Sequence, residues 1–456
     1  MPIKKVHSYI DANTENNILE LKKLVAQPSV SNNNLEVAKC SKVLKGIMEK
    51  AGIETKIINT DGNPIVFGHL RSNREKTLTL LFYGHYDVQP VGDLDLWESQ
   101  PFEPEIRNGR MYGRGTADNK GQLITHILAV KHYLEVLGDV PINIKFVFEG
   151  EEEIGSKHLA KFARENKELL SADMVYTSDG AMGINDVPNI IFGVRGVMNF
   201  DLSLDTSTTD NHSGNKGGVI KNAAWEMVKL LNTMKDEDDN VLIKGFYEDV
   251  VPPSEYDLKL IERLPYEPSE LAKIYGVEKL ELTKNQFYSN LMFKPTLTIN
   301  GLKSGYIGAG AKNIIPGRAI AKMEVRLAFD QDPEDVFKKI KNHIVNINPR
   351  VKIKRVEEDM LPSRTSTDLP LSRTIVKAVS CFFKDRPVEM PVIGGSLPDY
   401  IWTKILGVPS ISVPYGNADE CNHAPNENMK MDLFNKGIHI SAQAIYDLGK
   451  ELSNYS

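Results

Sequence analysis

Five segments of this chain carry histidine or acidic side chains of the kind that bind divalent metal ions. They read GHYDV, GRGTADNKG, FEGEEEIGS, YTSDG and CNHAPNE. Imidazole nitrogens and carboxylate oxygens suit zinc, and they also bind manganese or cobalt. The candidate metal ligands, in chain order, are His85, Asp118, Glu153, Asp179 and His423.

The acidic run in FEGEEEIGS offers a second function beside metal binding. A carboxylate can bridge two ions, and such a pair lowers the pKa of a shared water and polarises a carbonyl. A neighbouring carboxylate that binds no metal can then take the proton of the water. Because Glu152 and Glu153 point in different directions from the backbone, one can bind metal while the other acts as the general base.

A further acidic residue lies close to the first histidine. Asp87 follows His85 by two residues, on the same face of an extended segment, so its carboxylate can orient the imidazole. We therefore count Asp87 with Glu152 among the candidate catalytic residues. Together these residue types predict a two-metal hydrolase.

Each feature also has a plainer explanation when it is taken alone. An H-x-D sequence is often a surface pair, and an acidic run such as 149–153 is often a solvated face. Asp179 before Gly180 is compatible with turn chemistry alone, and His423 with an ordinary surface histidine. The case for a metal site rests on their shared position at the ends of predicted strands.

The flanking sequence predicts the elements that would position these residues. Apolar spacing typical of helices covers 14–27, 34–51 and 120–137. Strongly apolar segments that end in histidine or acid read as strands at 77–88, 142–150 and 172–180. This alternation predicts an α/β layer with a mostly parallel sheet and helices on both faces. Ligands bind beyond the carboxyl ends of such strands, so the five segments can converge.

The pattern changes near Arg195 and resumes near residue 362. Between them we predict strands at 197–206, 294–302, 317–330 and 351–358, with helices at 218–235 and 333–347. The order β–α–β–β–α–β is typical of a ferredoxin-like module. We therefore predict an inserted α+β domain at 195–361, within a first domain formed by 1–194 and 362–456. The charged, proline-containing stretch 236–290 has no assigned element.

Composition excludes several classes of function. The 456 residues carry a net charge of −6, with 41% hydrophobic and 25% charged residues, and no clustered basic surplus that would indicate a nucleic-acid partner. The N-terminal residues lack the apolar region of a secretory signal, and no run is long enough to span a membrane. Cys40, Cys381 and Cys421 lie too far apart to suggest a disulfide framework, and we interpret Cys421 as a small buried residue. We expect a cytoplasmic location.

Seven motifs, taken in order, resemble the M20 metallopeptidase family, and within it the dipeptidase branch that includes carnosinase-like enzymes. They are GHYDVQP, GRGTADNKG, FEGEEEIGS, TSDG, DNHSG, GGSLPDY and CNHAPNE, and they extend from about residue 80 to 430. The resemblance implies a catalytic domain with two divalent ions in each subunit, zinc above all and manganese or cobalt otherwise. It also implies an inserted lid domain that forms a homodimer, and a small peptide as substrate.

The resemblance also implies a role for each ligand. His85 and Asp179 would bind one metal ion, and Glu153 and His423 the other. Asp118 would bridge the two ions, and in this family a cis peptide bond often follows that aspartate. Glu152 would be the general base. This chain has three consecutive glutamates where the family needs two, so a shift of one residue would make Glu151 the base.

Residues of the inserted domain and of GGSLPDY resemble substrate contacts of the family. His212 would stabilise the oxyanion in the partner subunit's active site; the less favoured alternative is a lid-surface histidine. Arg326 would hold the substrate carboxylate, since a guanidinium offers two parallel donors; an arginine in an alternating strand is otherwise solvent-facing. Asn313, Gly395 and Ser396 would contact the substrate.

Two other functions remain open at this stage. Deacylation of an N-acyl amino acid, of the acetylornithine or succinyl-diaminopimelate type, needs the same metal chemistry and differs only in the pocket. A non-catalytic binding protein of the same fold would be expected to lack the base or a ligand, and this chain retains both. The length of the 236–290 segment favours the dipeptidase branch.

Overall fold

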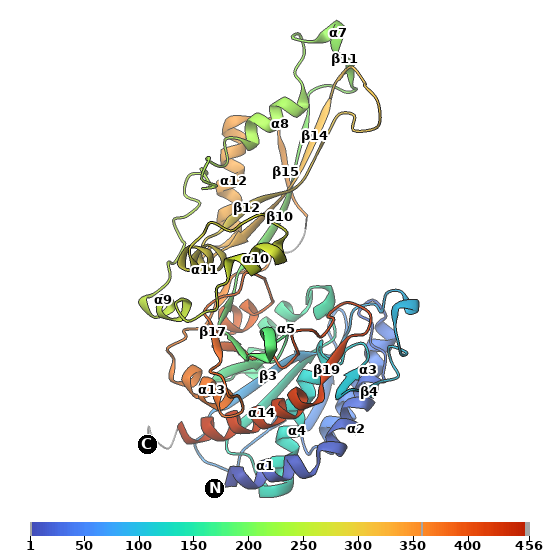
Figure 1. Cartoon of the computed structure of the whole chain (residues 1–456), viewed down its shortest axis with the longest axis vertical. Coiled ribbons are helices and arrows are strands. Elements are labelled where there is room, and N and C mark those ends of the chain that lie inside the picture. Colours follow the sequence, from blue (N-terminus) through green and yellow to red (C-terminus); the bar gives the residue numbers. More distant parts are fainter. Residues whose placement is uncertain (1, 357–358, 452–456) are drawn as a thin grey trace. The chain divides into compact units, whose positions relative to one another are not determined.

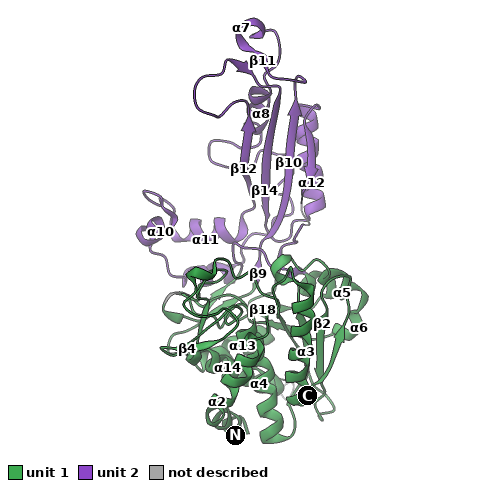
Figure 2. Ribbon diagram, turned by 90° about the vertical axis from the view of Figure 1, so that its right-hand side faces the viewer, with its two compact units in different colours: residues 1–192, 364–391, 401–456 green, residues 193–363, 392–400 purple. Residues whose placement is uncertain are grey.

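The computed structural model describes residues 2–356 and 359–451, and the chain divides into two compact units. Unit 1 comprises Met1–Phe192, Arg364–Pro391 and Ile401–Ser456, and unit 2 comprises Gly193–Ser363 and Val392–Tyr400 (Figure 1, Figure 2). The inserted domain at 195–361 stays a prediction. Unit 2 spans a similar range and additionally contains the short segment 392–400.

Unit 1 is built on an eight-stranded sheet in the order β1-β2-β6-β3-β7-β18-β8-β17. The central pairs β6–β3, β3–β7 and β7–β18 are parallel, whereas β1–β2 and β2–β6 are antiparallel. The strands are β1 (Glu54–Ile58), β2 (Ile65–Leu70), β3 (Thr79–His85), β6 (Asn143–Glu149), β7 (Met174–Thr177), β8 (Asn189–Ile191), β17 (Val388–Met390) and β18 (Ser410–Ser412). The prediction of a mostly parallel sheet is confirmed.

Helices cover both faces of this sheet, as predicted. On one face, Phe82 of β3 stacks on His126 of α4 (Lys120–Leu137), with ring centroids 4.3 Å apart. The helices grouped there with α4 are α1 (Pro2–Ala12), α2 (Thr14–Val25), α3 (Asn34–Lys50), α13 (Pro370–Ser380) and α14 (Met431–Glu451). On the other face, Tyr83 packs on Trp402 of the π-helix η4 (Ile401–Leu406), which contacts α5 (Leu159–Glu165). Because both faces are covered, β3 is buried along nearly its whole length.

Unit 2 contains a four-stranded antiparallel sheet in the order β12-β14-β10-β15. The strands are β10 (Gly196–Asp205), β12 (Thr296–Ser304), β14 (Arg318–Leu327) and β15 (Lys352–Arg355), with helices α8 (Ala223–Leu231) and α12 (Pro333–Ile347). In chain order these elements read β–α–β–β–α–β, and their spatial order is that of a ferredoxin-like sheet. Apolar residues of β10, β14, α8 and α12 form a separate core, which confirms the predicted α+β module.

Several elements differ from the prediction. The stretch 236–290 contains α9 (Glu255–Ile261), α10 (Pro268–Tyr275) and the first part of α11 (Lys284–Phe293). Helices α9 and α11 begin with capping boxes from Ser254 and Thr283. Local caps and Pro268 start these helices, whereas the high charge of the segment hides their apolar faces. Helix α8 is shorter than the predicted 218–235 because Asn222 caps its start. The last two residues of the predicted strand 351–358 lie outside the described residues.

The remaining elements of the described chain are short. They are the strands β4 (Glu105–Arg107), β5 (Arg110–Tyr112), β9 (Gly193–Val194), β11 (Asn211–His212), β13 (Ile314–Ile315), β16 (Ser363–Arg364) and β19 (Asn428–Lys430), the helices α6 (Lys167–Leu170) and α7 (Ser213–Lys216), and the single turns η1 (Leu94–Leu96), η2 (Glu152–Ile154) and η3 (Ile184–Asp186). No helix in 2–356 or 359–451 combines the length and apolar character needed to cross a bilayer.

Candidate metal centre

The five predicted metal ligands of unit 1 lie together beyond the carboxyl ends of its parallel strands. His85 is the last residue of β3, Glu153 lies in η2 shortly after β6, and Asp179 lies two residues after β7. Asp118 immediately precedes Asn119, the N-cap of α4, and His423 lies in the segment that leads to β19. Parallel strands that end at one edge explain why residues so distant in sequence converge there.

The ligands form two clusters that share Asp118. His85, Asp118 and Asp179 form the first, and Asp118, Glu153 and His423 form the second; within each, the candidate ligand atoms lie within 4.8 Å of one another. His85 Nε2 lies 3.0 Å from Asp118 Oδ1, whereas His423 Nε2 lies 3.1 Å from Asp118 Oδ2. Each Asp118 oxygen therefore faces a different histidine, which is the arrangement of a carboxylate that bridges two ions.

The donor set fits a pair of divalent cations. Each cluster offers one imidazole nitrogen and two carboxylates, a combination that suits zinc and related ions. His85 Nε2 is buried and makes no hydrogen bond of acceptable geometry within the described chain, so this nitrogen is available for a metal. Burial, together with the nearby Asp118 carboxylate, raises the pKa of Glu153 to about 7. A cation between these carboxylates would relieve that repulsion.

The histidines and Asp118 perturb one another's ionisation. Burial opposes the charge on Asp118, yet the facing imidazoles of His423 and His85 hold the pKa of Asp118 below its usual range. Burial likewise disfavours the His85 cation, but the carboxylates of Asp118, Asp179 and Asp87 outweigh it and raise the pKa of His85. The centre thus favours ionised carboxylates around any positive charge.

Asp87 is fully buried beneath the cluster and joins its two halves. Its carboxylate lies 3.5 Å from His85 Nδ1, and its backbone oxygen lies closer, at 3.1 Å. The same carboxylate accepts hydrogen bonds from the backbone N–H groups of Glu152 and Glu153, each at 3.2 Å. Asp87 therefore orients the imidazole and also fixes the turn that carries the two glutamates.

The three consecutive glutamates have different surroundings. Glu151 accepts a hydrogen bond from Asn63 N at 3.0 Å on one oxygen and pairs with His158 Nδ1 at 2.8 Å on the other. Glu153 faces His423 at 3.2 Å. The Glu152 carboxylate has no hydrogen-bond partner among the described residues, and burial, with the charges of Asp179 and Asp118, raises its pKa well above the usual range.

Two residues that the sequence analysis missed hold the ligands in place. Gln89 donates to Glu153 from its backbone nitrogen at 3.1 Å and from its side chain at 2.9 Å. Glu427 is fully buried and accepts the backbone N–H groups of Gly115, Ala117 and Asp118. Both lie within the family-like segments GHYDVQP and CNHAPNE, which is the signal that could have identified them.

Two further backbone and side-chain features concern the ligand segments. The peptide bond between Asp118 and Asn119 is cis, as the family resemblance implies. Cys421 is exposed, so its interpretation as a buried residue was wrong. Its positive φ of 56° places it in a turn at the surface rather than in a core-facing element.

The predicted substrate residues of unit 2 fall into two groups. His212, in β11, is exposed, and its Nδ1 accepts the N–H of Gly214 at 3.0 Å; the backbone of Asn313 accepts a hydrogen bond from Ser213 N nearby. Because Nδ1 is an acceptor, a neutral His212 ring carries its proton on Nε2. Arg326 instead donates from Nη1 to Ser396 Oγ at 3.0 Å.

The Arg326 group contains a second arginine that the sequence analysis missed. Arg195 donates from Nε to the carbonyl of Gly394 at 3.0 Å, and its backbone N–H donates to the Gly395 carbonyl at 3.1 Å. Burial and the charge of Arg326 lower the pKa of Arg195 to about 10. One carboxylate, Glu324, neutralises part of this charge by a two-bond contact with Arg326.

The two groups lie at opposite ends of the unit 2 sheet. Arg326 pairs with Val197 at the start of β10, whereas Arg318 pairs with Asp205 at its end, and His212 follows beyond that end. Eight residues of strand correspond to roughly 25 Å. An extended dipeptide spans about 7 Å, so His212 and Arg326 of one chain cannot contact the same dipeptide.

Comparison with known families and structures supports the same type of site. The sequence model of peptidase family M20/M25/M40 matches residues 81–447 of this chain. The human beta-Ala-His dipeptidase is 27% identical, in an alignment that covers 98% of this chain and 93% of that protein. The Cys-Gly metallodipeptidase dug1 of Schizosaccharomyces pombe is also 27% identical, with 98% of each chain covered.

Solved structures show the same likeness. The M20 family metallo-carboxypeptidase Sso-CP2 from Sulfolobus solfataricus has a TM-score of 0.84 and 32% identity, covering 95% of this chain and 99% of its own. Human carnosine dipeptidase 1 has a TM-score of 0.73 and 26% identity, covering 98% of this chain and 100% of its own. The likeness extends over both compact units.

Proposed function

This chain belongs to peptidase family M20/M25/M40, and from that premise we propose that it hydrolyses the amide bond of dipeptides or short peptides with a free terminal carboxylate. The chain is a metal-dependent hydrolase, and its relatives include a beta-Ala-His dipeptidase and a Cys-Gly metallodipeptidase. The observation that carries the proposal is the shared Asp118 carboxylate beside the unengaged carboxylate of Glu152.

The chemistry follows from the ligands and the base. Two zinc ions, held by His85 and Asp179 and by Glu153 and His423 with Asp118 between them, would supply a water of lowered pKa and polarise the scissile carbonyl. Glu152 accepts the proton of the attacking water and later returns it to the leaving nitrogen. Asp87 keeps Glu152 in reach of that water by holding its backbone N–H.

The raised pKa of Glu152 suits both halves of this role. Burial and the neighbouring carboxylates favour its protonated form, whereas bound cations favour its ionised form. Because these two influences shift the pKa of Glu152 in opposite directions, the residue can take a proton and later give it back. Glu151 is engaged on both oxygens, which supports Glu152 rather than Glu151 as the base.

Recognition of the terminal carboxylate falls to the arginine group of unit 2. Arg326 binds Glu324 and Ser396, and the second N–H groups of its Nη1 and Nη2 atoms can donate to a substrate carboxylate. Gly395 is the neighbour of Ser396 on the same segment. Arg195 adds a second positive charge beside Arg326, more than Glu324 alone neutralises. A substrate carboxylate would complete the charge balance of this group.

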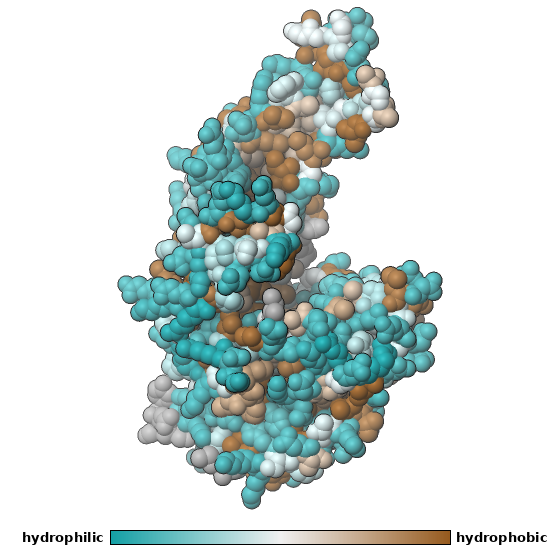
Figure 3. Space-filling view, in the orientation of Figure 1, coloured by the Kyte–Doolittle hydropathy of each residue, from teal (hydrophilic) through white to brown (hydrophobic). Residues whose placement is uncertain are grey.

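The oxyanion donor would come from a second subunit. His212 lies too far along the sheet from Arg326 to reach the same dipeptide within one chain, so the His212 that completes a site would belong to a partner in a homodimer. Strand β12 is an edge of the unit 2 sheet, and its Ile299 and Leu302 are exposed. Figure 3 shows apolar residues gathered on this unit near α8 and β14. An open apolar edge suits pairing with a second copy.

Removal of the base tests the proposal. The Glu152→Ala enzyme should keep both metal ions, measured by elemental analysis, and lose about 10²–10⁴-fold in turnover of a dipeptide. The matched control is Glu165→Ala, an exposed glutamate of α5, which should behave as the unaltered enzyme. Near-normal turnover by the Glu152→Ala enzyme would remove Glu152 from the mechanism.

A substrate panel separates the peptidase from the deacylase. Dipeptides such as beta-Ala-His and Cys-Gly, a tripeptide, and N-acetyl and N-succinyl amino acids should be compared by kcat/KM. We expect the free dipeptides to lead, and amidation of their carboxyl terminus to lower kcat/KM by about ten-fold or more, because the arginine group loses its charged partner. Faster cleavage of the N-acyl amino acids would identify a deacylase instead.

Subunit mixing tests the role of His212. Glu152→Ala and His212→Ala homodimers are each expected to be inactive, but exchange of their subunits would create hybrid sites with both residues intact. Part of the activity should therefore return after exchange. Absence of any recovery, with exchange verified by a mass tag, would rule out action in trans.

A further inference from the structure

A cavity of unit 1 lies on the sheet at the end opposite the metal centre. It has a volume of about 680 Å³, within the size range of sites that bind small molecules. Thr79 and Asn143, the first residues of β3 and β6, line it, whereas the metal centre lies beyond the last residues of β3 and β6. Six strand steps, or roughly 20 Å, separate the two sites.

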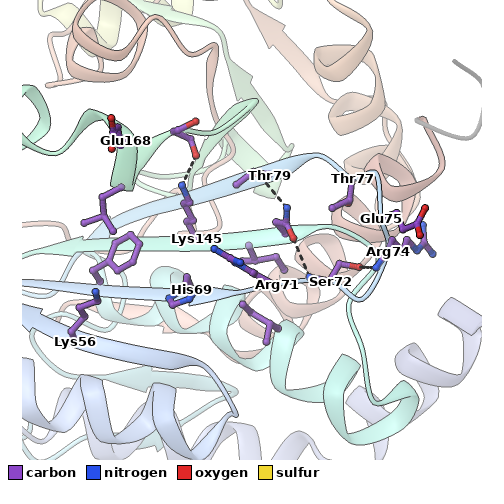
Figure 4. A pocket seen from close by; sticks show the side chains of 16 residues that line it. Lys56, His69, Arg71, Ser72, Arg74, Glu75, Thr77, Thr79, Lys145 and Glu168 are labelled. Atoms are coloured by element: carbon purple, nitrogen blue, oxygen red, sulfur yellow. Dashed lines mark hydrogen bonds between the residues drawn. The ribbon is translucent and has the colours of Figure 1, made fainter. Parts of the chain in front are cut away.

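Strand pairing gathers basic side chains on the floor of this cavity. Lys56 of β1 pairs with Phe67 of β2, and His69 of β2 pairs with Lys145 of β6. Residues directly opposite or two apart lie on the same face, so these four side chains form one patch. Figure 4 shows Lys145 and His69 with Arg71 between them, and Lys56 on the neighbouring strand β1.

The cavity carries more positive charge than its own carboxylates can balance. Four lysine or arginine side chains line it, Lys56, Arg71, Arg74 and Lys145, against the carboxylates of Glu75 and Glu168. The Arg71 guanidinium has no hydrogen-bond or ion-pair partner among residues 2–356 and 359–451. Arg74, in contrast, is bound to the carbonyl of Gly449 at 2.9 Å. Arg71 is therefore free to bind a ligand.

Lys145 is held close to Arg71 without an acid between them. Its Nζ donates to the carbonyl of Ser171 at 2.6 Å, which fixes the ammonium at the cavity wall. Burial and the charge of Arg71 lower the pKa of Lys145. His69 Nδ1, on the same patch, is buried and unsatisfied within the described chain. An anion between Arg71 and Lys145 would remove this repulsion.

We propose that this cavity binds a phosphate-bearing small molecule, with the phosphate between Arg71 and Lys145. A guanidinium fork and an ammonium group approach a tetrahedral oxyanion from different directions. The hydroxyls of Ser72 and Thr79 line the same cavity, act as acceptors within the protein, and can donate to further oxygens. The volume left beyond one phosphate accommodates an organic group such as a nucleoside, with Phe67 on the floor.

Calorimetric titration of the metal-loaded enzyme tests the proposal, with inorganic phosphate and AMP as probes. Arg71→Gln and Lys145→Gln should each weaken binding by about ten-fold, as expected for loss of one charged hydrogen bond. Lys42→Gln, an exposed lysine of α3 outside the cavity, is the control and should bind as the unaltered enzyme does. Phosphate held at the metal ions would be unaffected by any of the three substitutions.

Two results would overturn the proposal. One is unchanged affinity for both probes in Arg71→Gln, whose fold and dipeptide turnover should be normal because the Arg71 side chain makes no hydrogen bond or ion pair within the described chain. The other is binding of succinate as tight as that of phosphate, since a dicarboxylate would then be the preferred class. An independent measurement follows the acetylation rate of Lys145 by mass spectrometry: phosphate should slow it several-fold, and an unchanged rate would contradict occupancy.

Discussion

The two ends of strands β3 and β6 carry opposite charge. The carboxylates of Asp118, Glu153 and Asp179 gather beyond their carboxyl ends, and Lys145 and Arg71 line the cavity at their amino ends. At one end burial among like charges raises the pKa of Glu153, and at the other it lowers the pKa of Lys145. Each end is thus electrostatically incomplete by itself and is stabilised by a ligand of opposite sign.

The apolar centre of the sheet keeps these two ends apart. Phe82, Phe146 and Tyr176 fill it, and His126 stacks against Phe82 there. The sheet of unit 1 can therefore carry a cation site at one end and an anion site at the other, because about 20 Å of packed side chains separate the two sites. Substitutions at either end, or in the centre, test this division.

The largest effect is expected from Asp118→Asn. An amide offers one oxygen and no negative charge, so it cannot bridge two cations as the carboxylate does. Turnover should fall by roughly 10³-fold or more, and metal content should fall with it. The control is Asp173→Asn, at the opposite end of the sheet, which accepts the Thr79 N–H and should leave turnover near normal. Full metal content in Asp118→Asn would show that the two clusters do not depend on it.

A smaller loss is expected from Asp87→Asn. The amide can accept only one of the two backbone hydrogen bonds from Glu152 and Glu153, and it weakens the contact with His85. Removal of such a supporting partner typically lowers metal affinity or activity by about 10–100-fold. Metal titration and kcat measure the two effects separately. The exposed Asp95→Asn variant is the control, and equal kinetics for the two variants would contradict the orienting role.

The buried His126 at the centre of the sheet should make the stability of the protein depend on pH. Burial lowers the pKa of His126 to about 3 in the folded protein, whereas an unfolded histidine titrates near 6.5. Between these values the unfolded state binds a proton that the folded state does not, so stability falls as the pH falls. From pH 7 to 5 this contribution is about 2 kcal/mol.

His126→Asn should therefore flatten the acid side of the stability profile by about that amount. Urea unfolding of the chelated protein at pH 7, 6 and 5 measures it without interference from metal loss. The Asn variant is expected to be less stable at pH 7, since it loses the stack on Phe82, but the gap should narrow on acidification. Parallel profiles would show that His126 does not titrate in this range.

The smallest expected effect is on the stability of the protein when the carboxylates of the metal centre have no bound cations. Glu152→Gln removes one of several mutually repelling carboxylates, so in the chelated protein it should raise the free energy of unfolding by about 0.5–2 kcal/mol. In the metal-loaded protein that gain should disappear, because the cations already balance the charge. Thermal unfolding with and without chelator compares the two states. A gain that persists with metal bound would point to packing rather than charge.

Much of the fold could be predicted because local patterns and tertiary environment agree. The strand that ends at His85 is apolar almost throughout, as its two covered faces require, and α12 has the predicted bounds 333–347. The helices within 236–290 were missed because their stability depends on caps such as Ser254 and Thr283 rather than on a strong apolar period. The strand order of the unit 2 sheet is that of the predicted ferredoxin-like module, and no single segment of sequence specifies it.

The candidate site was predictable to the extent that its residues occupy recognisable segments. Four of the five ligands lie near the end of a strand or the start of a helix, and His423 joins them from the loop before β19. Gln89 and Arg195 could not be assigned from residue type, since a glutamine or an arginine in a loop has many uses and only distances reveal its partner. The basic cavity escaped notice for the same reason, because Lys56, Arg71 and Lys145 are scattered in sequence and meet only through strand pairing.

The buried Glu427 carboxylate sets a limit on when the metal centre can form during biosynthesis. It accepts the N–H groups of the turn that carries Asp118, yet 309 residues separate Asp118 from Glu427. A nascent chain that has already exposed His85, Asp118 and Glu153 to the cell therefore lacks the group that shapes the bridging turn. The final geometry of the metal centre therefore requires the C-terminal segment, which supplies both Glu427 and the ligand His423.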